Sequence, residues 1–229
     1  MRAVLCYHKV GTEAAEGRWI NVSPETLAAH IRFFQRRGYA VVMPAEVARK
    51  GLDRAVALTF DDAFLSMLDN GVPVLQSCGV KATIYAVSEK VGASADWEGC
   101  HGEPLASWER LREAQSAGME IGNHTATHAS FKSLDYAAQV EEIKRCDSRL
   151  REEGLNPLTF CLPYGHYSAE TSEAIRESGY DIGFTVEKRW VRDSDDPRLL
   201  PRFAMSFGDK VPGLLYKLFI RPMISSSKR

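Results

Sequence analysis

The sequence lacks three features that would each define a class of protein. It has no apolar run that approaches the roughly 20 residues a transmembrane helix needs. It has no block of like charges, since 29 Lys and Arg stand against 30 Asp and Glu and leave a net charge of −1. This balance argues against a nucleic-acid partner, whose phosphates select a basic face. Residues 1–8 hold too short an apolar run for a signal peptide, so we expect a cytoplasmic protein.

Cysteines are few and show no pairing pattern. There are five of them, spread along the chain without a C-x-x-C pair: Cys6, Cys78, Cys100, Cys146 and Cys161. A secreted disulfide scaffold has a dense and usually even set, so we expect a reduced, intracellular chain.

Length and composition predict one large domain. The chain has 229 residues, of which 45% are hydrophobic and 26% are charged, as is ordinary for a globular protein. We expect a single domain over residues 1–224, followed by a flexible tail over the serine-rich residues 225–229.

Short apolar runs alternate along the chain with helix-like patterns. Strands are expected near residues 3–7, 39–43, 54–60, 81–87, 119–123, 158–162 and 181–185. Helix starts are marked by Ser23-Pro24 and by Ser107. Repeated β-then-α units imply parallel strands joined by right-handed crossovers. We therefore predict an α/β fold: a single distorted or incomplete (β/α)7-type barrel with its active site at the C-terminal ends of the strands.

Two adjacent carboxylates end one of these apolar runs. Asp61 and Asp62 follow the strand expected at 54–60, and such close like charges need a cation or a proton. His124 and His128 follow the strand expected at 119–123. Taken alone, the carboxylates are compatible with a turn, and the histidines with ordinary hydrogen-bonded side chains. Together they suggest a metal-dependent hydrolase.

Three segments in register resemble a known family. Thr59-Phe60-Asp61-Asp62, His124-Thr125-Ala126-Thr127-His128 and Pro163-Tyr164-Gly165 are similar to the successive motifs of the NodB-type polysaccharide deacetylases, carbohydrate esterase family four. The matching context reaches from Tyr7-His8 to Leu200-Pro201-Arg202. The resemblance is closest to the branch of the poly-N-acetylglucosamine deacetylases.

This resemblance implies a metal site and its chemistry. It makes Asp62, His124 and His128 the ligands of a divalent metal and Asp61 the general base. One carboxylate and two imidazoles suit zinc, and also cobalt, nickel or iron.

The resemblance also implies how the oxyanion is stabilised. The backbone N–H of Tyr164 is expected to stabilise the oxyanion, in a turn that Pro163 fixes.

The general acid and the partner of the base depart from the common family pattern. A late histidine usually supplies the acid, but no histidine follows His166. We predict that His8 takes this role, with His166 as a competing acid or substrate contact. A buried, structural His8 is the alternative. Many members carry an arginine where this chain has Cys161, so we expect Arg202 to brace Asp61 from another strand.

Other aromatic and apolar segments allow two interpretations. Trp108 is expected to stack on the sugar, although aromatic residues are more often part of the core. His101 is expected to lie in a loop or face the substrate rather than a metal. The stretch 211–222 is either a terminal helix packed on the barrel or a peripheral contact with the inner face of a membrane.

The expected activity is hydrolysis of the N-acetyl group of an N-acetylated amino sugar, in a glycan or a lipid-linked saccharide, with release of acetate. A C–N hydrolase acting on a cyclic amide or imide is the alternative, because the same metal and base serve both reactions. A non-catalytic carbohydrate-binding protein would not need a metal triad together with a free base.

Overall fold

The computed structural model describes residues 1–100 and 102–220. His101 and the expected tail at 225–229 lie outside the described residues. Within them, eight strands form one sheet in the order β10-β1-β5-β6-β7-β8-β9, with β4 also paired to β5. Their bounds are β1 (Arg2–Tyr7), β4 (Ala40–Val42), β5 (Ala55–Phe60), β6 (Thr83–Ala86), β7 (Glu120–Asn123), β8 (Phe160–Cys161), β9 (Gly183–Phe184) and β10 (Phe203–Ala204). Every pairing between these strands is parallel. A separate two-stranded sheet joins β2 (Lys9–Val10) to β3 (Asn21–Val22).

The main sheet curls until one short segment bridges its two ends. The Thr185 amide, just after β9, donates to the Leu200 carbonyl over 2.8 Å. A few residues later the Met205 amide, just after β10, donates to the Cys6 carbonyl of β1, also over 2.8 Å. The segment from Leu200 to Met205 therefore connects β9 to β1. The predicted single, distorted α/β barrel is confirmed.

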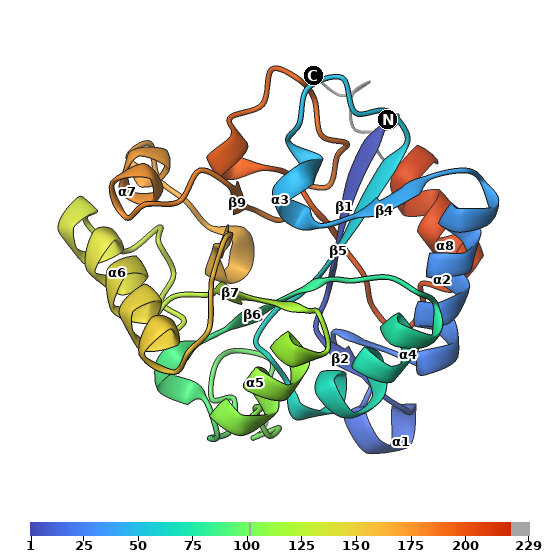
Figure 1. Ribbon diagram of the computed structural model, residues 1–229, viewed down its shortest axis with the longest axis horizontal. Coiled ribbons are helices and arrows are strands. Elements are labelled where there is room, and N and C mark those ends of the chain that lie inside the picture. Colours follow the sequence, from blue (N-terminus) through green and yellow to red (C-terminus); the bar gives the residue numbers. More distant parts are fainter. Residues whose placement is uncertain (101, 221–229) are drawn as a thin grey trace.

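The distortion has a visible cause at β5 (Figure 1). β1 pairs with β5 along its whole length, from Ala55 to Phe60. The other edge of β5 is shared, because β4 pairs with residues 55–57 and β6 pairs with residues 59–60. One strand thus has three neighbours, and the barrel departs from a regular succession of strands.

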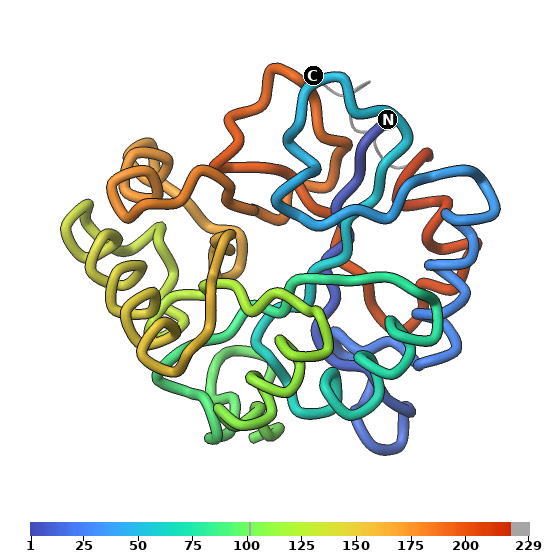
Figure 2. The backbone as a smooth tube through the Cα atoms, viewed as in Figure 1, coloured from blue at the N-terminus to red at the C-terminus, as the bar shows by residue number. Residues whose placement is uncertain are grey.

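Helices surround the curled sheet (Figures 1 and 2). Their bounds are α1 (Glu13–Glu16), α2 (Pro24–Arg36), α3 (Pro44–Val47), α4 (Val72–Ser77), α5 (Trp108–Ser116), α6 (Tyr136–Glu152), α7 (Thr171–Glu177) and α8 (Val211–Leu215). The expected caps are present: Ser23 Oγ accepts from the Thr26 amide over 3.2 Å, and Ser107 Oγ accepts from the Arg110 amide over 3.3 Å. These bonds satisfy amides that the first turn of a helix leaves free.

The strands separate two apolar layers because successive side chains point to opposite faces. Along β1, Leu5 and Tyr7 join the outer core under the helices, and Val4 joins the interior of the barrel. The interior cluster is small and also contains Ala57, Tyr85, Cys161 and Phe184. Continued alternation along β5 turns Thr59 and Asp61 inward, so the first carboxylate of the pair projects into the barrel.

The C-terminal stretch packs on the barrel over the described residues up to 220. Leu214 and Leu218 are buried, and Trp190 Nε1 donates to the Leu218 carbonyl over 2.7 Å. Lys217 Nζ donates to the Ala204 carbonyl over 2.7 Å. Packing of this terminal segment on the barrel is therefore confirmed for residues 211–220. Across the described ranges, no helix has the length and apolar character required to cross a membrane.

Candidate active site

Three buried side chains meet at the C-terminal ends of β5 and β7. Asp62 follows β5, and His124 and His128 follow β7. The Asp62 Oδ1 atom lies 3.4 Å from His124 Nε2 and 3.2 Å from His128 Nε2. The predicted metal-ligand set thus converges on one point, and its nitrogen and oxygen atoms lie within 4.8 Å of one another.

Tight turns, rather than a helix, bring these residues together. Asp62, Thr125 and His128 all have positive φ angles, of 71°, 69° and 66°. Residues other than glycine seldom adopt this region, and such strain gathers at functional sites. The turn is held by Thr125 Oγ1, which accepts from the His128 amide over 3.0 Å. Two histidines four apart therefore face the same carboxylate without a helix between them.

The donor set fits a divalent cation. His124 Nδ1 is hydrogen-bonded to the Cys161 carbonyl over 2.8 Å, which leaves Nε2 facing Asp62. Within the described residues the buried Oδ1 atom of Asp62 has no hydrogen-bond donor. Burial alone would raise the pKa of Asp62, but contacts with His124 and His128 have the larger effect and hold it well below its ordinary value. An ionised carboxylate and two imidazole nitrogens are the donors that zinc and similar metals take.

Asp61 does not join this set but pairs with Arg202. Arg202 donates from Nη1 and Nη2 to the two carboxylate oxygens of Asp61, each over 2.7 Å. Its remaining N–H groups donate to Thr59 Oγ1 over 3.0 Å, to the Thr185 carbonyl over 2.8 Å and to Cys161 Sγ over 2.9 Å. All five guanidinium donors are therefore used. The contact predicted between Arg202 and Asp61 is present.

The charge of Arg202 decides the protonation of Asp61. Burial raises the pKa of Asp61, and the charge and hydrogen bonds of Arg202 lower it to about 2. Asp61 is consequently ionised over the neutral range and able to accept a proton.

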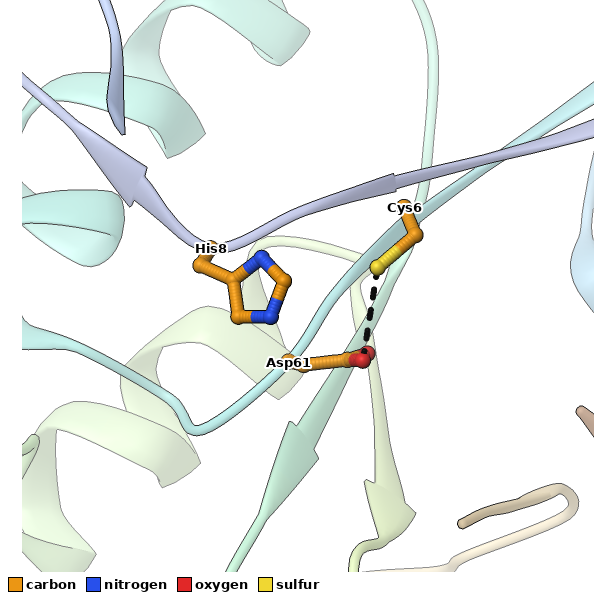
Figure 3. A group of neighbouring side chains, drawn as sticks. All are labelled: Cys6, His8 and Asp61. Atoms are coloured by element: carbon orange, nitrogen blue, oxygen red, sulfur yellow. Dashed lines mark hydrogen bonds between the residues drawn. The ribbon is translucent and has the colours of Figure 1, made fainter. Parts of the chain in front are cut away.

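His8 lies beside Asp61, at the end of β1 (Figure 3). Its ring nitrogen, Cys6 Sγ and a carboxylate oxygen of Asp61 lie within 4.8 Å of one another. The Cys6 thiol also contacts Asp61 Oδ2 over 3.4 Å. Burial lowers the pKa of His8, although Asp62 and Asp61 oppose this effect. The structure thus brings His8 into the site, and its role as the acid stays a prediction.

The Pro163-Tyr164-Gly165 turn forms another part of the rim. Tyr164 has a φ of 58°, and its ring lies 4.7 Å from the ring of His128. The amides of Gly165 and His166 donate to the carbonyls of Leu162 and Pro163. In the described part of the chain, the Tyr164 amide makes no such bond. It is therefore free to bind an oxygen atom.

His166 lies at the exposed side of this turn. Its Nδ1 atom is hydrogen-bonded to Ser130 Oγ over 2.9 Å, and its ring lies 5.6 Å from the ring of Tyr164. Its expected role as a substrate contact stays a prediction.

Trp108 and Trp97 have different surroundings in the structure. Trp108, the first residue of α5, is half-buried against the outer core and lies under the Arg149 guanidinium, 5.1 Å from its ring centre. Its expected contact with substrate stays a prediction. Trp97 was not predicted, yet its ring stacks on His128 at 4.2 Å. The sequence signal was slight: one aromatic residue in the long loop between β6 and α5.

Comparisons with known proteins find similar sequences. YxkH of Bacillus subtilis is 26% identical over 193 residues, which cover 80% of this chain and 64% of that protein. The poly-beta-1,6-N-acetyl-D-glucosamine N-deacetylase of Escherichia coli K12 is 28% identical over 227 residues, covering 80% of this chain and 33% of that protein. The chain therefore spans only about a third to two thirds of these relatives.

Solved structures share the fold. IcaB from Ammonifex degensii has a TM-score of 0.79 at 25% identity and covers 93% of this chain and 94% of its own. The Streptococcus pyogenes deacetylase PplD, solved with acetate, has a TM-score of 0.78 at 20% identity, with coverages of 94% and 96%.

The family model described as Polysaccharide deacetylase matches residues 48–183. This range is more than half of the chain and contains Asp61, Asp62, His124 and His128, while His8 and Arg202 fall outside it. The chain belongs to the polysaccharide deacetylase family.

Proposed function

We propose that this chain is a metal-dependent deacetylase, which hydrolyses the N-acetyl group of an N-acetylated amino sugar and releases acetate. The observation that carries the proposal is that two adjacent carboxylates have different partners. Asp62 faces two imidazole nitrogens, whereas both carboxylate oxygens of Asp61 accept hydrogen bonds from Arg202. A ligand and a base thus stand side by side, which amide hydrolysis requires and binding alone does not.

The base and the acid come from neighbouring strands. Asp61 accepts the proton of the attacking water, and its pKa of about 2 keeps it ionised for this purpose. His8 donates a proton to the departing amine, which leaves poorly without one. β1 and β5 are paired over six residues, so the two groups stand on adjacent strand ends.

The remaining groups stabilise charge. Asp62, His124 and His128 would hold the metal. Bound there, a divalent cation would lower the pKa of water and polarise the acetamide carbonyl. The Tyr164 amide, which makes no backbone hydrogen bond in the described residues, donates to the oxygen that gains negative charge.

We further propose zinc as the native metal. One carboxylate and two imidazoles form a common ligand set for catalytic zinc, and cobalt, nickel or iron suit the same set. Elemental analysis of the protein, purified without added metal, distinguishes these ions.

The substrate class is tested by acetate release. We expect turnover on N-acetylglucosamine oligomers or on lipid-linked N-acetyl sugars when zinc or cobalt is supplied. The name of the Escherichia coli relative supports a β-1,6-linked glycan as the first substrate to try. Absence of turnover on both substrates, together with hydrolysis of a cyclic amide or imide, would move the assignment to that other class of C–N hydrolase.

The proposed location is the cytoplasm, at the inner face of a membrane. Tyr216 and Ile220, after α8, are 48% and 49% exposed and supply apolar surface for peripheral contact. Co-sedimentation with anionic vesicles tests this proposal. Binding that persists unchanged after Tyr216→Ser and Ile220→Ser would contradict contact through this segment.

A further inference from the structure

The two histidines of the candidate metal site are held in different ways. A metal-binding histidine usually donates its second ring N–H to a carbonyl or a carboxylate, and this bond fixes the orientation of the ring. His124 follows this rule through the Cys161 carbonyl, 2.8 Å away. Over residues 1–100 and 102–220, the buried Nδ1 atom of His128 has no such partner. Among the described residues, the contacts that can orient the His128 ring are therefore packing contacts.

Aromatic rings surround His128 instead. The Trp97 ring is stacked on it, with centroids 4.2 Å apart and an angle of 29° between the planes. Tyr164 meets it at 4.7 Å and a steeper 62°. The stacked indole restricts rotation of the imidazole about its Cβ–Cγ bond, because this rotation would tilt the ring into the indole.

Backbone hydrogen bonds and apolar packing hold the loop that carries Trp97. Its loop is bonded to the segment that follows Asp62: the Ala106 amide donates to the Ala63 carbonyl, and the Leu65 amide donates to the Pro104 carbonyl, each over 2.9 Å. Trp97 also packs beside a small apolar cluster of Phe64, Ala95 and Leu105. The start of the loop is also bonded to the segment that carries His128, since the Ser88 and Glu89 amides donate to the Thr125 and Ala126 carbonyls. The loop that carries Trp97 is therefore held at both the Asp62 and the His128 side of the site.

We infer that Trp97 is a positioning residue for the metal site, whose indole holds the His128 imidazole in its ligating orientation by stacking, in place of a hydrogen bond. This inference rests on the metal site of the proposed function. It assigns a role to a residue that contacts neither the base nor the acid in the described structure.

The test is metal affinity rather than activity. Zinc binding is measured for the parent, Trp97→Ala and Trp97→Phe by competition with a chromophoric chelator. We expect Trp97→Ala to weaken zinc binding about tenfold or more, within the range of lost outer-shell contacts. Trp97→Phe keeps a stacked ring and should stay within about threefold of the parent. The visible spectrum of the cobalt-loaded protein should change in Trp97→Ala and not in Trp97→Phe.

Trp19→Ala is the matched control. Trp19 is 63% exposed and touches the same loop, since a Cβ on Gly99 would lie 2.5 Å from its Nε1 atom. It has no ring contact with His128 among the described residues, so its loss should leave zinc affinity unchanged. An equal loss in Trp19→Ala would mean that loop order, and not stacking, controls the site.

Two outcomes separate this inference from the proposed function. A parent protein that binds no metal would overturn both. A parent that binds zinc, with a folded Trp97→Ala of parental affinity, would overturn only the role of Trp97. If Trp97→Ala does not fold, the comparison of Trp97→Phe with a nonaromatic Trp97→Leu decides, because equal affinity in these two would refute stacking.

Discussion

Replacement of Arg202 by methionine should destabilise the protein far more than loss of an ordinary ion pair. Arg202 is fully buried, and its removal leaves the Asp61 carboxylate without its cation in a buried site. Breaking a buried pair in this way costs about 3–5 kcal/mol. Arg112 pairs with Glu153 at the same 2.7 Å, but its side chain is 47% exposed. Arg112→Met should therefore cost no more than about 1 kcal/mol.

The pH dependence follows from the pKa of Asp61. A folded-state pKa of about 2, against an ordinary 3.8, contributes stability above pH 4 that is lost as the pH falls toward 2. The difference corresponds to about 2 kcal/mol. In Arg202→Met, burial still raises the pKa of Asp61, but the arginine that lowered it is absent. Protonation of Asp61 in acid then removes the buried negative charge. The free-energy gap between parent and variant should be widest at pH 7 and narrower at pH 4.

Urea unfolding of both variants and the parent, with chelator present and followed by circular dichroism at pH 7 and pH 4, measures these differences. The reasoning is refuted if Arg202→Met and Arg112→Met lose equal stability at pH 7. A gap that does not change with pH would also refute it, because the Asp61 charge would then not be the source of the loss.

Further substitutions probe the site. Asp62→Ala should lose zinc in metal analysis, whereas Asp61→Asn should keep it and lose activity by roughly 10²–10⁴-fold; equal zinc loss would mean that the two roles are misassigned. His8→Ala should bind zinc and fold, yet release acetate about 10²–10⁴ times more slowly; a near-parental rate, with failure of His166→Ala instead, would make His166 the acid. Gly165→Ala should lower stability by about 1–3 kcal/mol in thermal unfolding, since its φ is +66° and a Cβ would lie 2.6 Å from a backbone nitrogen; an unchanged melting temperature would contradict this.

The sequence predicted those parts of the fold that depend on local patterns. The apolar run at 54–60 became β5, and Ser23 capped α2 as expected, because burial and capping are properties of short segments. The expected strands at 158–162 and 181–185 shrink to two residues each, β8 and β9. Strand length depends on neighbouring strands in a distorted barrel, which a single run of residues does not specify.

The candidate site also contains parts that the sequence predicts and parts that it does not. The ligand set and Asp61 were predictable because their spacing is carried by motifs. The stacking of Trp97 on His128 was not predictable, because a loop residue finds its partner only through the tertiary fold. The contact of Trp108 with the Arg149 guanidinium likewise joins α5 to α6 and depends on the tertiary fold.

The segment that bridges the two ends of the sheet also carries Arg202. All of the expected metal ligands precede it in the chain by more than 70 positions, so a ribosome makes them first. Until residues 200–205 are added beside β1, the carboxylate of Asp61 has no guanidinium to keep its pKa low. The bidentate contact between Arg202 and Asp61 therefore forms only after the ligand residues have been made and the last strand of the sheet has docked beside β1.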